Sequence, residues 1–140
     1  MDNAKTILLV EDEGPVRRLI SNILGMVKYR ILEAVHGEDA LAVSESFKGE
    51  IHLLVTDIMM PVMNGQELAT RLSSLRPGLG ILFISGYPGK HIPEGLESGT
   101  VDYLAKPFKA DILLEKVRSL LSETSGGHRA TGSGNPALPK

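Results

Sequence analysis

Five short apolar runs constrain the fold of this chain more than any other feature of its sequence. They are TILLV (6–10), RILEA (30–34), IHLLVTD (51–57), LGILFIS (79–85) and VDYLA (101–105). Nearly continuous apolar character is typical of strands that are buried on both faces of a parallel sheet. We therefore expect five buried strands rather than strands that alternate between core and solvent.

Between most of these runs, apolar residues recur at helical spacing. This periodicity predicts helices over residues 14–27, 37–47, 65–75 and 109–122. In the first helix the apolar residues that recur at this spacing are Val16, Leu19, Ile20, Ile23, Leu24 and Val27. Alternation of strands and helices predicts a single doubly wound α/β domain with helices on both faces of a parallel sheet.

Two segments depart from this regular pattern. Residues 86–100, GYPGKHIPEGLESGT, contain four glycines and two prolines, so a helix there should be short or irregular. Residues 123–140 are rich in Gly, Ser and Pro and have few apolar residues, which predicts a disordered tail. The expected domain therefore covers residues 1–122.

Composition limits the classes of partner. The 140 residues carry a net charge of −2, which gives no electrostatic case for direct binding to nucleic acid or to an anionic membrane. The apolar runs are far shorter than the roughly 20 residues of a membrane-spanning helix, so no membrane insertion is expected. The chain has no cysteine, which fits a reducing compartment. We expect a soluble, cytoplasmic protein.

Polar residues follow the apolar runs where the predicted strands end. These residues are Glu11, Asp12, Asp57, Ser85 and Lys106. Because parallel strands end at one edge of a sheet, where ligands bind, the five side chains should share a pocket. Three carboxylates, a hydroxyl and an ammonium can hold a divalent cation and accept a phosphoryl group on an aspartate.

Each residue also has a plainer interpretation when it is taken alone. Asp57 could be a solvated residue at a strand–loop junction, and Asp12 could cap the following helix. Lysines such as Lys106 are usually exposed, and a Ser-Gly pair such as Ser85-Gly86 commonly starts a turn. Capping needs one acid, however, whereas the sequence EDE at residues 11–13 supplies three.

Four pieces in order resemble the receiver domain of two-component response regulators. They are LLVEDE (8–13), VTDIMMPVMNG (55–65), ISG (84–86) and DYLAKPF (102–108), and the resemblance covers about residues 4–122. It implies a flavodoxin-like sheet with strand order 2-1-3-4-5. SGYPG (85–89), followed by an interrupted helix, is more similar to the receivers of hybrid sensor histidine kinases than to those of DNA-binding regulators.

The resemblance implies that Asp57 is the phosphoacceptor, and that its partner is a histidine kinase or a histidine phosphotransfer protein. It also implies a Mg²⁺ site. Asp12 and Asp57 would bind the ion, Glu11 would act through water, and the backbone carbonyl of Met59 would be a further ligand. Mg²⁺ usually binds one or two carboxylates together with phosphate oxygens and waters.

Further roles follow from the same resemblance. Lys106 would pair with Asp57 and then with the phosphoryl oxygens, and the Lys106–Pro107 peptide bond would be cis. The hydroxyl of Ser85 would reach the phosphoryl group, and the rotamer of Tyr103 would follow Ser85 as a switch. Such a domain is not an enzyme in the usual sense, because it catalyses only its own phosphorylation and slow dephosphorylation.

Two other functions remain as alternatives. A small phosphohydrolase with an aspartate nucleophile would usually have a second acid two residues later, where this chain has Met59. A flavodoxin-like adaptor that works without phosphorylation would not need an acidic pocket with Lys106. Both features favour the receiver interpretation.

Overall fold

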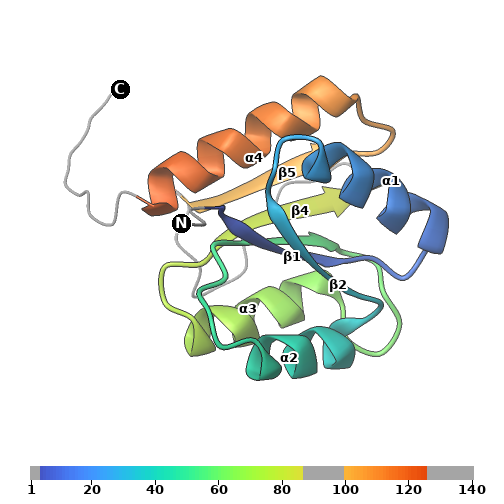
Figure 1. Ribbon diagram of the computed structural model, residues 1–140. Helices are drawn as coiled ribbons and strands as arrows, with labels where there is room; N and C mark the ends of the chain where they lie inside the picture. The colour runs from blue at the N-terminus through green and yellow to red at the C-terminus, as the bar shows by residue number, and fades with distance from the viewer. Residues whose placement is uncertain (1–3, 87–99, 126–140) are drawn as a thin grey trace.

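The computed structural model describes residues 4–86 and 100–125. Within these ranges, strands and helices alternate along the chain (Figure 1). The elements are β1 (Thr6–Val10), α1 (Gly14–Gly25), β2 (Arg30–Ala34), α2 (Gly37–Ser46), β3 (Leu53–Asp57), α3 (Gly65–Leu75), β4 (Gly80–Ser85), β5 (Val101–Ala105) and α4 (Ala110–Ser125).

The five strands form one parallel sheet in the order β2-β1-β3-β4-β5, which confirms the expected α/β fold and strand order. Val10 pairs with Ala34 and Thr56, and Ser85 pairs with Ala105, so the strands end close to one another. This register places the loops that follow β1, β3 and β5 at the same edge.

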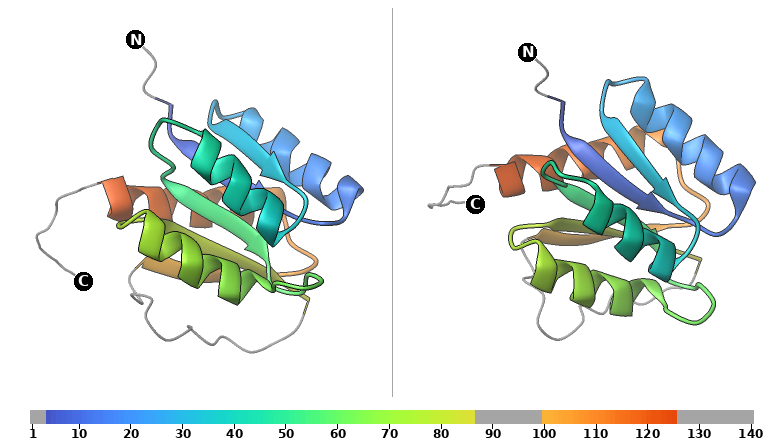
Figure 2. Two further views of the ribbon diagram at one scale, coloured as in Figure 1. Left: turned by 90° about the horizontal axis from the view of Figure 1, so that it is seen from below. Right: turned by 60° about the horizontal axis from the view of Figure 1, so that its bottom comes forward.

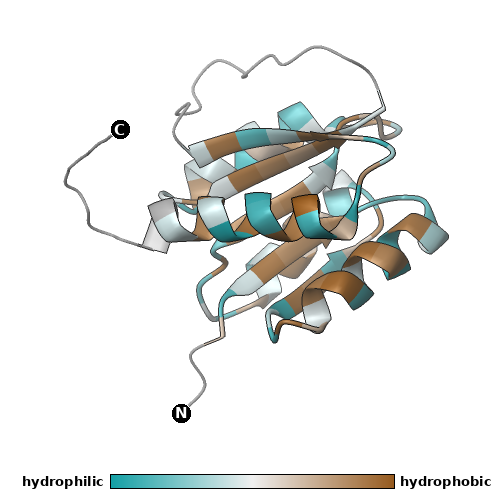
Figure 3. Cartoon of the chain, turned by 90° about the horizontal axis from the view of Figure 1, so that it is seen from above, coloured by the Kyte–Doolittle hydropathy of each residue, from teal (hydrophilic) through white to brown (hydrophobic). Residues whose placement is uncertain are grey.

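Helices cover both faces of the sheet. α1 and α4 lie on one face and α2 and α3 on the other (Figures 1 and 2). Two apolar clusters correspond to these layers: Leu8 packs with residues of α2 and α3, whereas Ile7 packs with residues of α1 and α4. Every residue of β1, β3 and β4 is buried, and the central strands are mostly hydrophobic in Figure 3. This explains their nearly continuous apolar sequences.

Two apolar residues of the periodic pattern in the first helix do not face the core. Leu19 is 53% exposed and Val27 is 43% exposed. α1 ends at Gly25, so Val27 lies beyond the helix and before Lys28, whose φ is 69°. Leu19 precedes Ile20 by about 100° around the helix, and only the narrower stripe that contains Ile20 meets the sheet.

The two irregular segments lie largely outside the described residues. A short or irregular helix is expected within residues 86–100, of which residues 87–99 are not described. A tail is expected over residues 123–140, of which residues 126–140 are not described. α4 continues to Ser125. The domain boundary at residue 122 therefore stays a prediction.

Gly65 fixes the start of α3 against the end of β3. Its backbone N–H donates a hydrogen bond to the carbonyl oxygen of Ile58 at 2.9 Å. A Cβ atom at position 65 would overlap the backbone carbonyl oxygen of Asp57. Because that oxygen belongs to the main chain, it cannot move aside without moving Asp57 itself. Gly65 is therefore required for the close approach of α3 to the end of β3.

We expect Gly65→Ala to destabilise the domain by about 1–3 kcal/mol, the usual cost of overpacking. Gly25→Ala is the matched control, because a Cβ there meets no atom within 4 Å and alanine favours the helix. Urea unfolding of the three proteins measures the difference. Equal free energies of unfolding for Gly65→Ala and the wild type would contradict the steric explanation.

Candidate functional site

The carboxyl edge of the sheet brings four of the expected residues together. One carboxylate oxygen from each of Glu11, Asp12 and Asp57 lies within 4.8 Å of the other two. The Nζ atom of Lys106 is 3.2 Å from Oδ2 of Asp57 and 3.5 Å from Oε1 of Glu11. The cluster therefore combines three carboxylates with one ammonium.

Asp57 is the last residue of β3, and its neighbours hold its carboxylate at the edge. The residue is 6% exposed, and its Oδ1 accepts a hydrogen bond from the backbone N–H of Met59 at 3.2 Å. The next residue, Ile58, donates its N–H to the carbonyl oxygen of Ile84 at 3.1 Å. The main chain just after β3 therefore remains hydrogen-bonded to β4, while the side chain of Asp57 lies in the pocket.

Glu11 and Asp12 follow β1 directly but differ in burial. Glu11 is only 1% exposed, its N–H bonds to Ala34 on β2, and its Oε2 accepts a hydrogen bond from the N–H of Glu13 at 3.1 Å. Asp12 is exposed. The cluster therefore has a buried side at Glu11 and a side open to solvent at Asp12.

Lys106 reaches the cluster from the loop after β5. Its backbone N–H donates to the carbonyl oxygen of Ser85 at 2.8 Å, which continues the pairing of β4 with β5. The Lys106–Pro107 peptide bond is cis, the isomer that the resemblance implies. The side chain of Lys106 is 25% exposed, and its ammonium contacts the carboxylates of both Glu11 and Asp57.

The negative charges at the site do not balance. With all groups ionised, three carboxylates and one ammonium sum to −2. Burial, with the charge of Asp57 as a smaller contribution, raises the pKa of Glu11 from 4.5 to about 7, against the lowering effects of the Glu13 N–H and of Lys106. Burial alone would lower the pKa of Lys106, but the charges of Glu11 and Asp57 outweigh it and raise that pKa.

These residues fit a divalent cation that prefers oxygen ligands. Oε1 of Glu11 is buried and has no hydrogen-bond partner among the described residues. Its ion-pair partner, the Lys106 ammonium at 3.5 Å, is shared with Asp57, so the pocket keeps an excess of negative charge. The donor set of Glu11, Asp12 and Asp57 is the oxygen-rich kind that Mg²⁺ binds.

The two expected switch residues lie on one face of neighbouring strands. Ser85 is 6% exposed at the end of β4, and Tyr103 is 8% exposed on β5. The ring of Tyr103 packs on Phe83, with 5.2 Å between ring centroids, and Phe83 is two residues before Ser85. Because side chains alternate along a strand, Phe83 and Ser85 point to the same face. Their roles in switching stay predictions, as does the Met59 carbonyl as a ligand.

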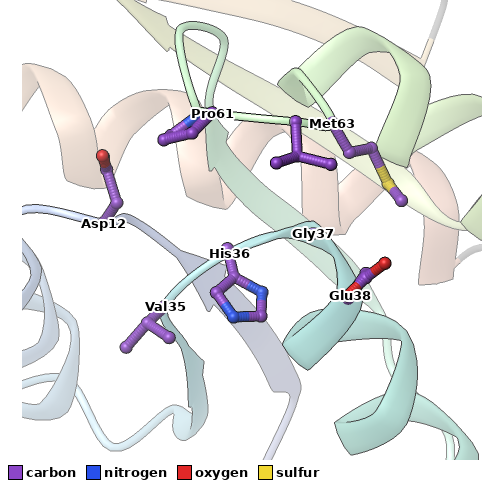
Figure 4. A pocket seen from close by; sticks show the side chains of 8 residues that line it. Asp12, Val35, His36, Gly37, Glu38, Pro61 and Met63 are labelled. Carbon is purple, nitrogen blue, oxygen red and sulfur yellow. The ribbon is translucent and has the colours of Figure 1, made fainter.

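The sequence did not predict a cavity beside the acidic cluster. Its volume is about 320 Å³, and it lies between the start of α2 and the loop that follows β3 (Figure 4). Its lining residues are Asp12, Val35, His36, Gly37, Glu38, Pro61, Val62 and Met63. Val62 has a φ of 70° and is 94% exposed, an uncommon backbone state for a β-branched residue. Only the folding of two distant loops toward each other creates this cavity.

Sequence reasoning also missed Arg17. Its guanidinium donates a hydrogen bond from Nη1 to the backbone carbonyl oxygen of Glu11 at 2.7 Å. Arginines on exposed helices are common, so nothing in the residue type or its spacing marks this one.

Comparison with known proteins agrees with this geometry. The sequence profile of the response regulator receiver domain matches residues 7–118. Sensor kinase CckA of Brucella abortus is 32% identical over 127 residues, which cover 88% of this chain and 13% of that protein. This chain spans between 13% and 66% of the length of the first curated relatives that it matches. No helix among the described residues is long and apolar enough to cross a membrane.

Solved structures show the same similarity. The receiver domain of hybrid histidine kinase CckA superposes with a TM-score of 0.72 at 34% identity, covering 83% of this chain and 98% of that one. Response regulator TrrA of Thermotoga maritima, solved in complex with Mg(2+)-BeF, gives a TM-score of 0.69 at 34% identity, covering 83% and 98%. The pocket of Glu11, Asp12 and Asp57 is typical of phosphoacceptor receivers. By its profile match and its similarity to these proteins, the chain belongs to the response regulator receiver domain family.

Proposed function

We propose that Asp57 accepts a phosphoryl group from the phosphohistidine of a histidine kinase or of a histidine phosphotransfer protein. The main support is the place of Asp57: a buried carboxylate at the end of β3, 3.2 Å from the ammonium of Lys106 and within an acidic cluster. Receiver domains are not classical enzymes, and histidine kinases are their general partners. The product is an aspartyl phosphate that serves as a signal.

In the transfer, one carboxylate oxygen of Asp57 attacks phosphorus, and the bond from phosphorus to the histidine nitrogen breaks. The electron pair of that bond returns to the imidazole. A carboxylate is a competent nucleophile for this chemistry, and positioning and charge stabilisation supply most of the catalysis. Mg²⁺ held by Asp12, Asp57 and the carbonyl of Met59, with Glu11 acting through water, would offset charge on the phosphoryl oxygens.

Lys106 has two roles in this scheme. Before transfer its ammonium offsets part of the charge of Asp57 and Glu11. After transfer it pairs with a phosphoryl oxygen, because the new group occupies the space beside Asp57. Removal of this ammonium would therefore weaken the stabilisation of the product as well as of the transition state.

The signal passes through Ser85 and Tyr103 in this proposal. The hydroxyl of Ser85 donates a hydrogen bond to the phosphoryl group, and β4 and β5 rearrange toward it. Tyr103, which packs on Phe83 of β4, changes its position in response. Phosphorylation thus biases an equilibrium between two states of the β4–β5 end of the sheet.

The setting of this chemistry is also part of the proposal. We place it in the cytoplasm, where histidine kinases obtain ATP, in a domain of residues 1–122 followed by a tail over 123–140. The similarity to a region of sensor kinase CckA supports a kinase as the donor. The net charge of −2 gives no support for direct binding to nucleic acid.

Acetyl phosphate with Mg²⁺ should phosphorylate the wild type at Asp57 alone, since Asp57 ends β3 and, unlike Glu11, accepts a hydrogen bond from the Lys106 ammonium, at 3.2 Å. Reduction of the acyl phosphate with borohydride, followed by mass spectrometry, locates the label. Asp57→Asn is the matched control and should remain unlabelled. Equal labelling of the variant would refute the assignment, and turnover of p-nitrophenyl phosphate by the wild type would favour a phosphohydrolase.

Mg²⁺ should raise the melting temperature of the wild type near pH 7. The ion offsets the excess negative charge of the cluster, and it binds only the folded arrangement of carboxylates. Asp12→Ala should show a smaller rise, because it removes the exposed carboxylate of the site. Thermal unfolding with and without MgCl₂ measures both. The same rise in both proteins would mean that the ion binds elsewhere.

Glu11 should make the metal-free domain less stable as pH rises from 4.5 to about 7. The folded state keeps the Glu11 proton up to a pKa of about 7, whereas the unfolded chain loses it near 4.5. Unfolding therefore releases a proton in this window, and the free energy of unfolding falls with rising pH.

Glu11→Gln has no such proton, so the difference in unfolding free energy between wild type and variant isolates this contribution from those of other carboxylates. Urea unfolding in EDTA at several pH values measures it. A difference that stays constant from pH 4.5 to 7 would contradict the burial of Glu11 described above.

A further inference from the structure

Arg17 joins three parts of the fold behind the acidic cluster. It lies on α1, and its side chain is 17% exposed. Nη1 donates to the carbonyl oxygen of Glu11 at 2.7 Å, and Nε donates to Oε1 of Glu33 on β2 at 3.3 Å. The hydroxyl of Ser21 donates to Oε2 of Glu33 at 3.0 Å and so orients that carboxylate. α1 lies beside β2 in Figure 1, which makes this bridge short.

The loop that Arg17 contacts is held at its helical end by the bond from the N–H of Glu13 to Oε2 of Glu11, but its N-cap side chain gives no further support. The N-cap residue of α1 is Glu13, whose side chain makes no capping hydrogen bond, and the first turn contains no acidic residue. By contrast, His36 caps α2 and Asn64 caps α3 through their side chains. At α1, the bond from Arg17 to the Glu11 carbonyl ties the helix to this loop, although it does not satisfy the helix N–H groups as a cap would.

This bond acts on the residues of the proposed metal site. The N–H of Glu11 is fixed to Ala34 on β2, and its carbonyl is fixed to Arg17. The main chain of Glu11 is thus held on both sides, and its Oε1 faces Lys106 at 3.5 Å. The same carbonyl is part of the peptide bond between Glu11 and Asp12. The orientation of this peptide therefore determines the position of the Asp12 main chain.

We propose that Arg17 is a positioning residue for the cation site, and that it acts by fixing the peptide between Glu11 and Asp12. The inference rests on the proposed function, because it concerns the Mg²⁺ that accompanies phosphorylation of Asp57. Arg17 contacts neither the ion nor the phosphoryl group. Groups that orient metal ligands in this indirect way typically affect metal affinity by 10–100-fold.

Charge alone predicts the opposite effect, which makes the proposal easy to test. Arg17 is a cation near the acidic cluster, so its positive charge repels an incoming Mg²⁺. If charge were its only influence, neutral substitution would strengthen Mg²⁺ binding. If it positions the Glu11–Asp12 peptide, the same substitution weakens binding despite the lost repulsion.

The test compares Arg17→Gln, Arg17→Lys and Arg18→Gln. Arg17→Lys keeps the charge but loses the planar donor set that reaches Glu11 and Glu33 together. Arg18 is the neighbouring exposed arginine, so Arg18→Gln matches the charge change of Arg17→Gln. Calorimetric titration with MgCl₂ gives the dissociation constant of each folded protein. We expect it to rise about 10-fold in both Arg17 variants and not to rise in Arg18→Gln.

A second measurement separates positioning from general loss of stability. The rate of phosphorylation by acetyl phosphate should need more Mg²⁺ to reach half its maximum in the Arg17 variants, and should recover at saturating Mg²⁺. Glu33→Gln, which leaves the bond from Arg17 to Glu11 in place, should show the same shift to a smaller degree. It also keeps the test decisive if Arg17→Gln fails to fold.

Arg17→Lys and Glu33→Gln proteins that bind Mg²⁺ as tightly as the wild type would overturn the positioning role. Tighter binding by Arg17→Gln would assign the effect of Arg17 to charge and would overturn it as well. A wild type that is not phosphorylated on Asp57 would instead refute the proposed function.

Discussion

The balance of charge among Glu11, Asp57 and Lys106 is the constraint on which the site depends. Two buried carboxylates share one ammonium, at 3.5 Å and 3.2 Å, and the exposed carboxylate of Asp12 adds a third negative charge. A domain built only for stability would pair these groups fully or replace them with apolar residues. Here the pocket is left with an excess of negative charge, which a bound cation would remove.

The fold makes this arrangement possible through the ends of its strands. Parallel strands in the order β2-β1-β3-β4-β5 place the loops after β1 and β3 side by side, and the loop after β5 at the same edge beyond β4. Close packing then fixes the main chain at each loop: Gly65 lets α3 approach the end of β3, and the Lys106 N–H continues the pairing of β5 with β4. The candidate site residues therefore have a fixed main chain: Asp57 ends β3, and Glu11 and Lys106 directly follow β1 and β5.

Much of this could be predicted from the sequence, because the signals are local. Continuous apolar runs mark strands buried on both faces, and the polar residues after these runs mark the edge where Glu11, Asp57 and Lys106 meet. The exposure of Leu19 could not be read from helical spacing, since spacing gives the width of an apolar stripe but not the width of the face that it meets. Arg17 and the cavity beside Asp12 also escaped prediction. The cavity depends on contacts between segments far apart in sequence. The hydrogen bond of Arg17 depends on a main-chain acceptor that any residue would supply.

Binding of beryllium fluoride, a mimic of the phosphoryl group, tests the central claim most directly. The receiver TrrA, 34% identical to this chain, was solved in complex with Mg(2+)-BeF. Fluorine NMR of this protein should show protein-bound fluoride signals only when Mg²⁺ is present, and none in Asp57→Asn. Bound signals that persist without Mg²⁺, or that are unchanged in Asp57→Asn, would contradict a cation-dependent phosphoacceptor at Asp57.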